Sequence, residues 1–310
     1  MKIVLLDAKT LGVDADLSLF KQFGHFEAFD TTALGERIEH IGDAKILLTN
    51  KVVIDKEVMD ACPNLGLICV CATGMNNIDL SYAKEKGICV KNVAGYSTAS
   101  VTQATFTLAL YLLGQAAYYD TYVKSGGWVK SPIFTHLDRP IVEIKGKKWG
   151  VIGFGTIGKE VAKIASAFGA RICYFSTSGA NADANFPRVD LEEMMRSCDI
   201  ISIHAPLNDN TKGLIGEREL SWMKKGAMLL NLGRGGIVDE VALANAIDEK
   251  GIYAGFDVVE IEPMEENNPL LHVKYKDRLA MSPHTAWASS EARAELIRLV
   301  GENIKDYLGQ

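Results

Sequence analysis

The stretch KKWGVIGFGTIGKEVAKIASAF, residues 147–168, decides the fold. An apolar, strand-like run leads into a glycine-rich turn, an amphipathic helical pattern follows, and a second apolar run, ARICYF, begins at residue 170. In such a unit the first glycine permits a tight turn, the second lets the backbone approach a pyrophosphate, and the third lets helix and strand pack closely. The pattern predicts a dinucleotide site with phosphates at the helix N-terminus. The predicted contacts in the turn are Gly153, Gly155, Thr156, Ile157 and Gly158.

The position that usually distinguishes NAD from NADP carries no acidic residue. A carboxylate about twenty residues past the turn would bond the ribose hydroxyls of adenosine and repel a 2′-phosphate. This sequence has Ser176, Thr177 and Ser178 there, and their hydroxyls could bond a phosphate, but no arginine stands beside them. Both NAD and NADP stay open as the cofactor, with a slight preference toward tolerating NADP.

Apolar runs alternate with helical patterns on both sides of this turn. Strands are predicted at residues 2–7, 44–50, 65–72, 87–93, 147–155, 170–175, 199–206, 227–233 and 253–259. Because the runs are continuously apolar, we expect burial on both faces, which is typical of parallel sheets covered by helices. Helical patterns cover residues 97–124 and, with amphipathic spacing, 286–307.

The chain has 310 residues, more than one hydrophobic core usually supports, so two α/β domains are expected. Both are predicted to be doubly wound parallel sheets, Rossmann-like or flavodoxin-like. The cofactor domain is placed at residues 98–284, and the substrate domain at residues 1–97 plus 285–310. The glycine- and proline-containing stretch SGGWVKSP, residues 125–132, is interpreted as the crossing between them. An interdomain cleft is expected to hold the active site.

Composition excludes several classes of partner. The formal net charge of −6, with no block of basic residues, argues against nucleic acid or an acidic membrane surface. The N-terminus has no signal-peptide pattern, and no apolar run approaches the ~18 residues of a membrane span. We therefore expect a cytoplasmic protein with no membrane association. The six cysteines have no CxxC or metal-ligand spacing, so buried reduced thiols and no metal site are expected.

Three later segments place polar residues just beyond apolar runs, where sites in open α/β sheets lie. They are LLNLGRGGIVDE (229–240), GFDVVEIEP (255–263) and MSPHTAWAS (281–289). Together with TGMNNIDL (73–80), AGYSTASVTQ (94–103) and NPLL (268–271), they resemble the D-isomer-specific 2-hydroxyacid dehydrogenase family over nearly the whole chain. The resemblance implies an oxidoreductase that transfers a hydride between a nicotinamide cofactor and a small 2-oxo or D-2-hydroxy acid.

The resemblance also implies a catalytic set, Arg234, Glu262 and His284. Imidazole titrates near neutral pH, so His284 can supply the proton of 2-oxo acid reduction, and Glu262 on its other ring nitrogen would favour the imidazolium. The planar fork of Arg234 can hold a carboxylate and a carbonyl. Further expected contacts are the backbone amides of Thr73 and Gly74 for the substrate, and His204, Pro206, Thr211, Leu232, Gly233 and Asp257 for the cofactor.

Each of these residues has a structural alternative. Arg234 could cap a helix or face solvent, and Glu262 could be a solvated loop acid. His284 and Asp257 could each serve only to stabilise the fold. The setting of the residues, directly after buried strands, favours the functional interpretation.

The resemblance narrows the substrate. Formate dehydrogenases of this fold pair the histidine with Gln, so Glu262 favours 2-oxo acids. The segments GYSTASVTQATFTLAL and SGGWVKSPIF resemble the glycerate dehydrogenase/hydroxypyruvate reductase branch, which implies hydroxypyruvate, glyoxylate or a similarly small acid. The alternative is a nucleotide-sensing, corepressor-like member of the fold with secondary activity. Tyr111, Leu112 and Leu113, on the apolar helix after Ser97, suggest a homodimer interface.

Overall fold

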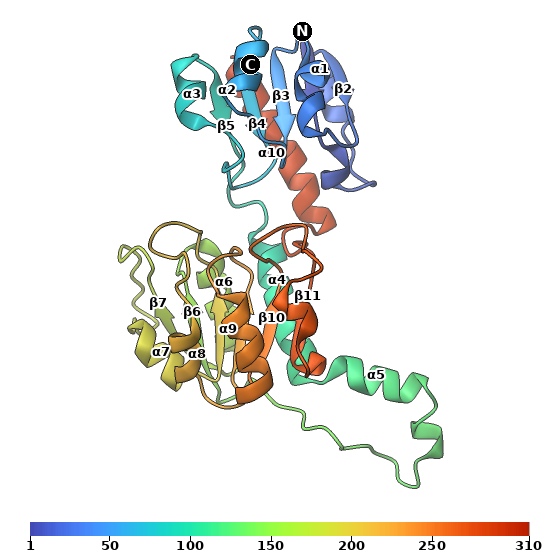
Figure 1. The fold of residues 1–310 in the computed structure, drawn as a ribbon, viewed down its shortest axis with the longest axis vertical. Coiled ribbons are helices and arrows are strands. Elements are labelled where there is room, and N and C mark those ends of the chain that lie inside the picture. Colours follow the sequence, from blue (N-terminus) through green and yellow to red (C-terminus); the bar gives the residue numbers. More distant parts are fainter. Residues whose placement is uncertain (310) are drawn as a thin grey trace. The chain divides into compact units, whose positions relative to one another are not determined.

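The chain of the computed structural model, described over residues 1–309, folds as two units (Figure 1). The first consists of Met1–Ser97 with Trp287–Gln310, and the second of Thr98–Ala286. The chain therefore crosses between units after Ser97 and after Ala286. The prediction that residues 125–132 form the crossing is wrong, because they lie within the second unit. Among the described residues, no helix combines the length and the apolar composition that a membrane span requires.

The first unit is built on a five-stranded parallel sheet with the order β2-β1-β3-β4-β5. Its strands are β1 (Lys2–Leu5), β2 (His25–Ala28), β3 (Ile46–Thr49), β4 (Leu67–Val70) and β5 (Cys89–Lys91). Its helices are α1 (Arg37–Ile41), α2 (Lys56–Ala61), α3 (Leu80–Glu85) and α10 (Ser290–Leu308), with 3-10 turns η1 (Ala8–Leu11), η2 (Ser18–Phe23) and η3 (Leu34–Glu36). The strand β2 was not predicted, because HFEA is a partly exposed edge segment and not an apolar run.

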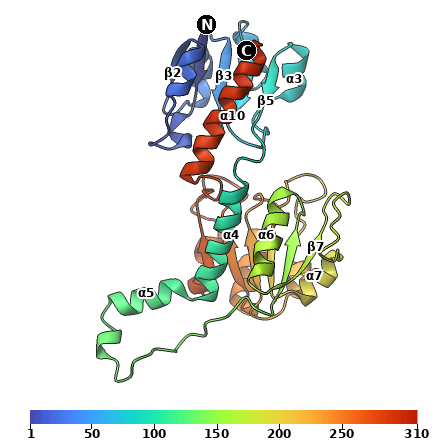
Figure 2. The same ribbon diagram turned by 180° about the vertical axis from the view of Figure 1, so that it is seen from behind.

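Alternate residues of the central strands of this sheet supply two separate cores. On one face Leu48 packs in a cluster with Val300 and Ile304 of α10. On the other face Leu47 packs in a cluster with Val58 of α2. The period of two along a strand explains why a continuously apolar run is needed, since both faces are covered by helices. Figure 2 shows α10 lying across its face of the sheet.

The second unit is a six-stranded parallel sheet with the order β11-β10-β9-β8-β6-β7. Its strands are β6 (Lys148–Ile152), β7 (Arg171–Phe175), β8 (Ile200–Ile203), β9 (Met228–Asn231), β10 (Tyr253–Phe256) and β11 (Leu279–Met281). Its longer helices are α4 (Thr98–Leu113), α5 (Ala116–Lys124), α6 (Thr156–Ala167), α7 (Leu191–Ser197), α8 (Glu217–Trp222) and α9 (Glu240–Asn245). The strand order reverses between β6 and β8, which is where open α/β sheets bind ligands. The predicted fold class is confirmed for both units.

Three 3-10 turns, η4 (Trp128–Lys130), η6 (Pro269–His272) and η7 (Lys276–Arg278), and the π-helical turn η5 (Ala246–Lys250) complete the second unit. The helix predicted over residues 97–124 is divided into α4 and α5. The break follows Gly114, where Gln115 adopts a left-handed φ of 52° and its side chain donates to Leu112 O at 2.9 Å. A left-handed residue cannot continue a right-handed helix, so α5 takes a new direction.

Residues 114–142, which we call the arm, extend from the rest of the second unit (Figures 1 and 2). The arm is closed at its root, where Val142 N donates to Leu113 O at 3.0 Å. It is ordered by its own aromatic contacts. Tyr118 Oη bonds His136 Nε2 at 2.7 Å, and the ring of Tyr122 stacks on His136 with centroids 3.7 Å apart.

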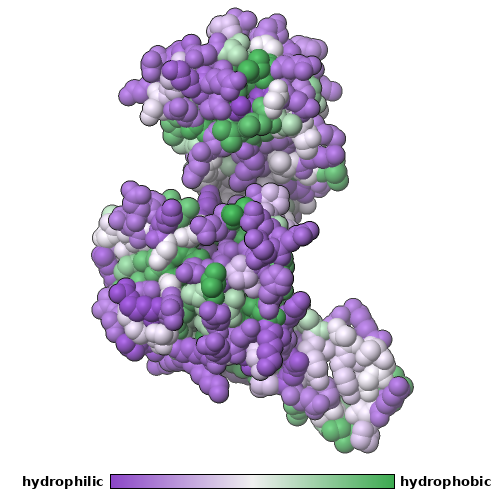
Figure 3. Space-filling view, viewed as in Figure 1, coloured by the Kyte–Doolittle hydropathy of each residue, from purple (hydrophilic) through white to green (hydrophobic). Residues whose placement is uncertain are grey.

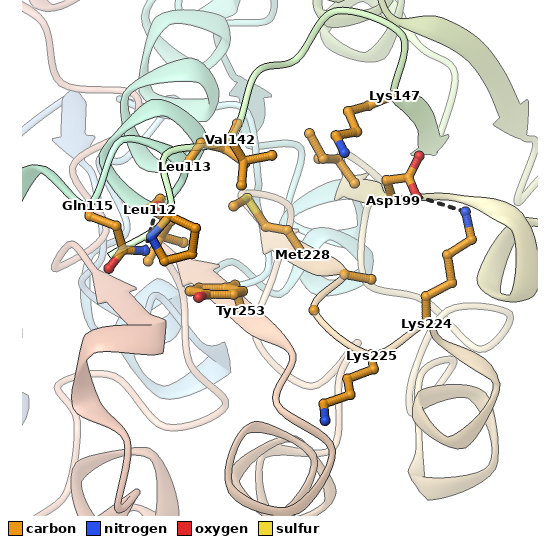
Figure 4. Close-up of a pocket in the computed structure, with 14 residues that line it drawn as sticks. Leu112, Leu113, Gln115, Val142, Lys147, Asp199, Lys224, Lys225, Met228 and Tyr253 are labelled. Carbon is orange, nitrogen blue, oxygen red and sulfur yellow. Dashed lines mark hydrogen bonds and ion pairs between the residues drawn. The ribbon is translucent and has the colours of Figure 1, made fainter. Parts of the chain in front are cut away.

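A small cavity of about 170 Å³ lies at the root of the arm (Figure 4). Met228 and Tyr253, which line it, are the first residues of β9 and β10. Beside them Lys224 Nζ donates to Asp199 Oδ1 at 2.7 Å. The cavity therefore lies at the amino ends of the strands, at the edge of the sheet opposite the predicted site.

In the first unit, a buried carboxylate fixes the loop after β3. Asp7 accepts from Asn50 N at 2.9 Å and from Lys51 N at 2.7 Å. Burial raises the pKa of Asp7 above its ordinary value, although these backbone hydrogen bonds lower it.

We expect Asp7→Asn to lower the free energy of unfolding of this unit by about 1–3 kcal/mol, because the NH2 group of the asparagine would then face a backbone N–H donor and could not accept from it. Urea titration checks this, with the exposed Asp43→Asn as control. Equal midpoints for both variants would contradict it.

Candidate active site

In the turn after β6, packing within the protein requires two of the three glycines, and the remaining one borders open space that a ligand can occupy. Gly153 has a φ of 86°, and a Cβ there would lie 2.6 Å from Ala205 N. A Cβ on Gly158 would overlap the carbonyl oxygen of Gly153. At Gly155, by contrast, a Cβ would meet nothing within 4 Å. The first and third glycines are required by packing, and the open space at the second fits the close approach of a pyrophosphate.

The other predicted residues of this turn lie at the start of α6. Thr156 is exposed and Ile157 is half-buried. Both belong to the first turn of the helix, whose N–H groups have no intrahelical partner and favour an anion. A dinucleotide phosphate is the anion that this turn fits.

The turn after β7 carries three residues with hydroxyl side chains, and the first of them is buried. Ser176 is 4% exposed, and its hydroxyl has no hydrogen-bond partner among residues 1–309. Thr177 is half-buried and Ser178 is exposed, and Ser178 Oγ accepts from Ala180 N at 3.3 Å. The groups of this turn that face solvent are therefore those of Thr177 and Ser178.

After β8, His204 and Pro206 begin a loop that Thr211 closes. Both ring nitrogens of His204 are buried without a partner among the described residues, and this burial lowers the pKa of His204 to about 3. The Thr211 hydroxyl is fully buried and donates to Pro206 O at 2.6 Å. This bond gives Thr211 a role inside the loop, while Pro206 is exposed.

The structure brings the three predicted catalytic residues to one edge of the sheet. Arg234 follows β9, Glu262 follows β10 and His284 follows β11. These three strands are neighbours and parallel, so their carboxyl ends meet at the same edge.

His284 and Glu262 form a direct pair. His284 Nδ1 lies 2.6 Å from Glu262 Oε2, and Glu262 Oε1 accepts from Val259 N at 3.3 Å. His284 has a left-handed φ of 54°, a conformation that is uncommon outside glycine and is found at functional sites. With Nδ1 bonded to the carboxylate, Nε2 is the ring nitrogen left for a ligand.

Asp257, predicted as a cofactor contact, anchors the histidine loop. Its carboxylate is 3% exposed and accepts from Ser282 Oγ at 2.5 Å, from Thr285 N at 2.9 Å and from Ala286 N at 3.0 Å. Burial raises the pKa of Asp257, and these hydrogen bonds lower it. The main-chain oxygen of Asp257 also accepts from His284 N at 2.8 Å. This anchoring role agrees with the structural alternative that the sequence left open for Asp257.

Asn231, which sequence reasoning missed, holds the arginine loop. It is 1% exposed at the end of β9, its Nδ2 donates to Arg234 O at 3.0 Å, and its Oδ1 accepts from Gly233 N at 3.1 Å. Leu232 and Gly233 are buried, and Arg234 Nη1 bonds Gly233 O at 2.8 Å. An asparagine ending an otherwise apolar strand was the available signal.

In the first unit, Thr73 and Gly74 lie in the loop after β4. Thr73 is exposed and Gly74 is half-buried. The Thr73 hydroxyl donates to Val93 O at 3.0 Å, and Thr73 O accepts from Asn92 Nδ2 at 2.6 Å. Two bonds thus hold this loop to the segment that follows β5.

Residues 106–286 match the family described as D-isomer specific 2-hydroxyacid dehydrogenase, NAD binding domain. The chain belongs to this family. The dehydrogenase is 36% identical to a hydroxypyruvate reductase of Blautia hydrogenotrophica, with 99% of this chain and 97% of the relative covered. It is also 36% identical to a glycerate dehydrogenase of Methylorubrum extorquens, with 99% and 96% covered.

Among solved structures, this dehydrogenase is similar to an acyclic imino acid reductase in complex with NADPH and D-Arg. The TM-score is 0.87 at 29% identity, and 100% of this chain and 98% of that chain are covered. The predicted family and enzyme class are confirmed, and the corepressor-like alternative is not favoured. A nicotinamide dinucleotide is the cofactor of the family.

The contrast between the glycines predicts different outcomes for two variants. Gly155→Ala should keep the wild-type melting temperature, because its Cβ enters open space, but weaken dinucleotide binding by roughly tenfold or more. Gly153→Ala should lower the free energy of unfolding by about 1–3 kcal/mol, because its backbone is left-handed and crowded. Circular dichroism melts and titration of nicotinamide fluorescence measure the two effects. Loss of stability in Gly155→Ala would contradict the assignment of that space to a ligand.

Proposed function

We propose that this dehydrogenase reduces hydroxypyruvate, glyoxylate or a similarly small 2-oxo acid to the D-2-hydroxy acid with NADH or NADPH. The observation that carries the proposal is the 2.6 Å bond between His284 Nδ1 and Glu262 Oε2. It supplies a proton donor at the edge where Arg234 and the cofactor turn also lie. The relatives named hydroxypyruvate reductase, glycerate dehydrogenase and glyoxylate reductase support this substrate class.

His284 is proposed to protonate the carbonyl oxygen of the substrate through Nε2. The carboxylate of Glu262 accepts a hydrogen bond from Nδ1, so Nε2 is the ring nitrogen that can donate a proton to the substrate. The bond also fixes the plane of the ring, and the anchoring of the loop by Asp257 fixes its position. When bound, the nicotinamide supplies a hydride to the carbonyl carbon.

Arg234 is proposed to bind the carboxylate and the carbonyl of the substrate. Guanidinium groups pair with carboxylates in two parallel hydrogen bonds, and Arg234 uses Nη1 to bond Gly233 O, which leaves its other donors available. When Arg234 holds the carboxylate of a short 2-oxo acid, the carbonyl of that acid has a defined orientation.

A panel of 2-oxo acids with NADH and NADPH tests the proposal through loss of nicotinamide absorbance. We expect hydroxypyruvate and glyoxylate to be reduced with higher kcat/KM than branched 2-oxo acids. His284→Ala should lower kcat/KM by roughly 10²–10⁴ because it removes the general acid, while cofactor affinity is retained.

The matched control is His272→Ala, since His272 is an exposed histidine of the same unit whose ring bonds a backbone oxygen, Glu266 O. It should behave as wild type. Undiminished turnover in His284→Ala, or no reduction of any 2-oxo acid by the wild-type chain, would refute the proposal.

We also propose that two copies of the chain pair through the arm. The arm exposes large apolar side chains, visible as green residues on its surface in Figure 3, and Val129 and Phe134 are 89% and 88% exposed. Exposed apolar patches on an ordered segment mark association surfaces. The sequence-based choice of Leu112 is wrong, because Leu112 is 2% exposed and packs toward Gly255 in the core. Tyr111 is 43% exposed and Leu113 is half-buried.

The double variant Val129→Asp/Phe134→Asp should convert a dimer to a monomer, because a buried interface cannot hold unpaired carboxylates. Light scattering after size-exclusion chromatography gives the mass. Val13→Asp, at a 99% exposed valine of the first unit, is the control and should stay dimeric. A monomeric wild type, or a dimeric double variant, would overturn this proposal.

A further inference from the structure

The turn after β7 lacks the arginine that binding of an adenosine 2′-phosphate calls for, yet the fold brings one to it. Arg188 is twelve residues beyond Ser176 in the sequence (188 − 176). Arg188 forms a parallel β-bridge with Tyr174 of β7. Two backbone hydrogen bonds hold it beside the strand: Tyr174 N donates to Pro187 O at 3.1 Å, and Val189 N donates to Tyr174 O at 3.0 Å.

The guanidinium of Arg188 lies against the turn itself. Its Nη1 donates to Gly179 O at 3.0 Å, and Gly179 N donates in turn to Ser176 O at 3.3 Å. The residue is exposed, and no carboxylate among residues 1–309 forms an ion pair with it. One of its five donors is used by the backbone, so the others are available to a ligand oxygen.

A neighbouring cavity, which is not lined by residues 176–178 or by Arg188, also suits a phosphate. This cavity of about 640 Å³ joins the second glycine of the cofactor turn to the segment after β7, and Gly155, Lys159, Asn181 and Asn185 line it. Its carboxylates have partners in the chain. Glu160 pairs with Lys163 at 3.7 Å, and Asp183 accepts from Asn185 N at 2.8 Å. No acidic residue occupies positions 176–178, where one would repel a 2′-phosphate.

We propose that Arg188 binds the 2′-phosphate of NADP and that this chain prefers NADPH over NADH. The assignment rests on the proposed dinucleotide site and adds the residue that selects between the two cofactors. A guanidinium against phosphate oxygens forms charge-assisted, paired hydrogen bonds, and it contributes nothing to NADH, which has a hydroxyl there. Thr177 and Ser178, at the solvent side of the same turn, complete the site.

The test compares binding and turnover in Arg188→Ala, Arg188→Lys and a matched control, Arg171→Ala. Arg171 is an exposed arginine at the opposite end of β7. We expect Arg188→Ala to weaken NADPH and adenosine 2′,5′-bisphosphate by roughly ten- to hundredfold, while NADH and adenosine 5′-monophosphate keep their affinities. Arg188→Lys should lose less, and Arg171→Ala should match wild type. Calorimetry measures affinity without turnover, and a thermal melt of each variant shows that it is folded.

The outcomes separate this assignment from the proposed function. A wild type that binds NADH more tightly than NADPH, or an Arg188→Ala variant that loses both cofactors equally, overturns the role of Arg188 and leaves the dehydrogenase intact. A wild type that binds neither dinucleotide overturns the proposed function and this assignment with it.

Discussion

The burial of one carboxylate, Asp257, is the interaction on which the geometry of the site depends. Its oxygens accept hydrogen bonds from the hydroxyl of Ser282 and from the backbone amides of Thr285 and Ala286. The residue after β10 therefore holds the loop that follows β11. A charge withdrawn from water is tolerated only when hydrogen bonds satisfy it. The left-handed backbone of His284 is one result, because the loop on both sides of it is fixed.

The parallel sheet places the chemistry where this anchoring can act. Three neighbouring strands end at one edge, and each is followed by one of the proposed catalytic residues, which has its own support. Asn231 holds the loop of Arg234, Val259 N bonds Glu262, and Asp257 holds the loop of His284. Each functional group is therefore positioned by a backbone that is itself bonded to a strand end, which is how precise orientation is achieved without a large site.

Apolar runs and the glycine turn were sufficient to predict the sheets, because burial on both faces leaves a strong signal in sequence. The edge strand β2 carries no such signal, and the break after Gly114 depends on one left-handed glutamine. In the site, the residues that could be named from motifs include Arg234, Glu262 and His284, whose side-chain chemistry suits the reaction of the family. Motifs do not reveal the residues that support the site, Asn231 and Ser282, or Arg188 beside the turn after β7. Their roles depend on which segments are neighbours in space, and this is known only from the fold.

The packing of α10 on the first unit has a consequence for the order of folding during synthesis. The core around Leu48 is completed by Val300 and Ile304, which are made after the whole of the second unit. The second unit, Thr98–Ala286, is contiguous and has all its strands before that point. On the ribosome the second unit can therefore fold before the first. Residues 1–97 keep one apolar face of their sheet uncovered until α10 has been made.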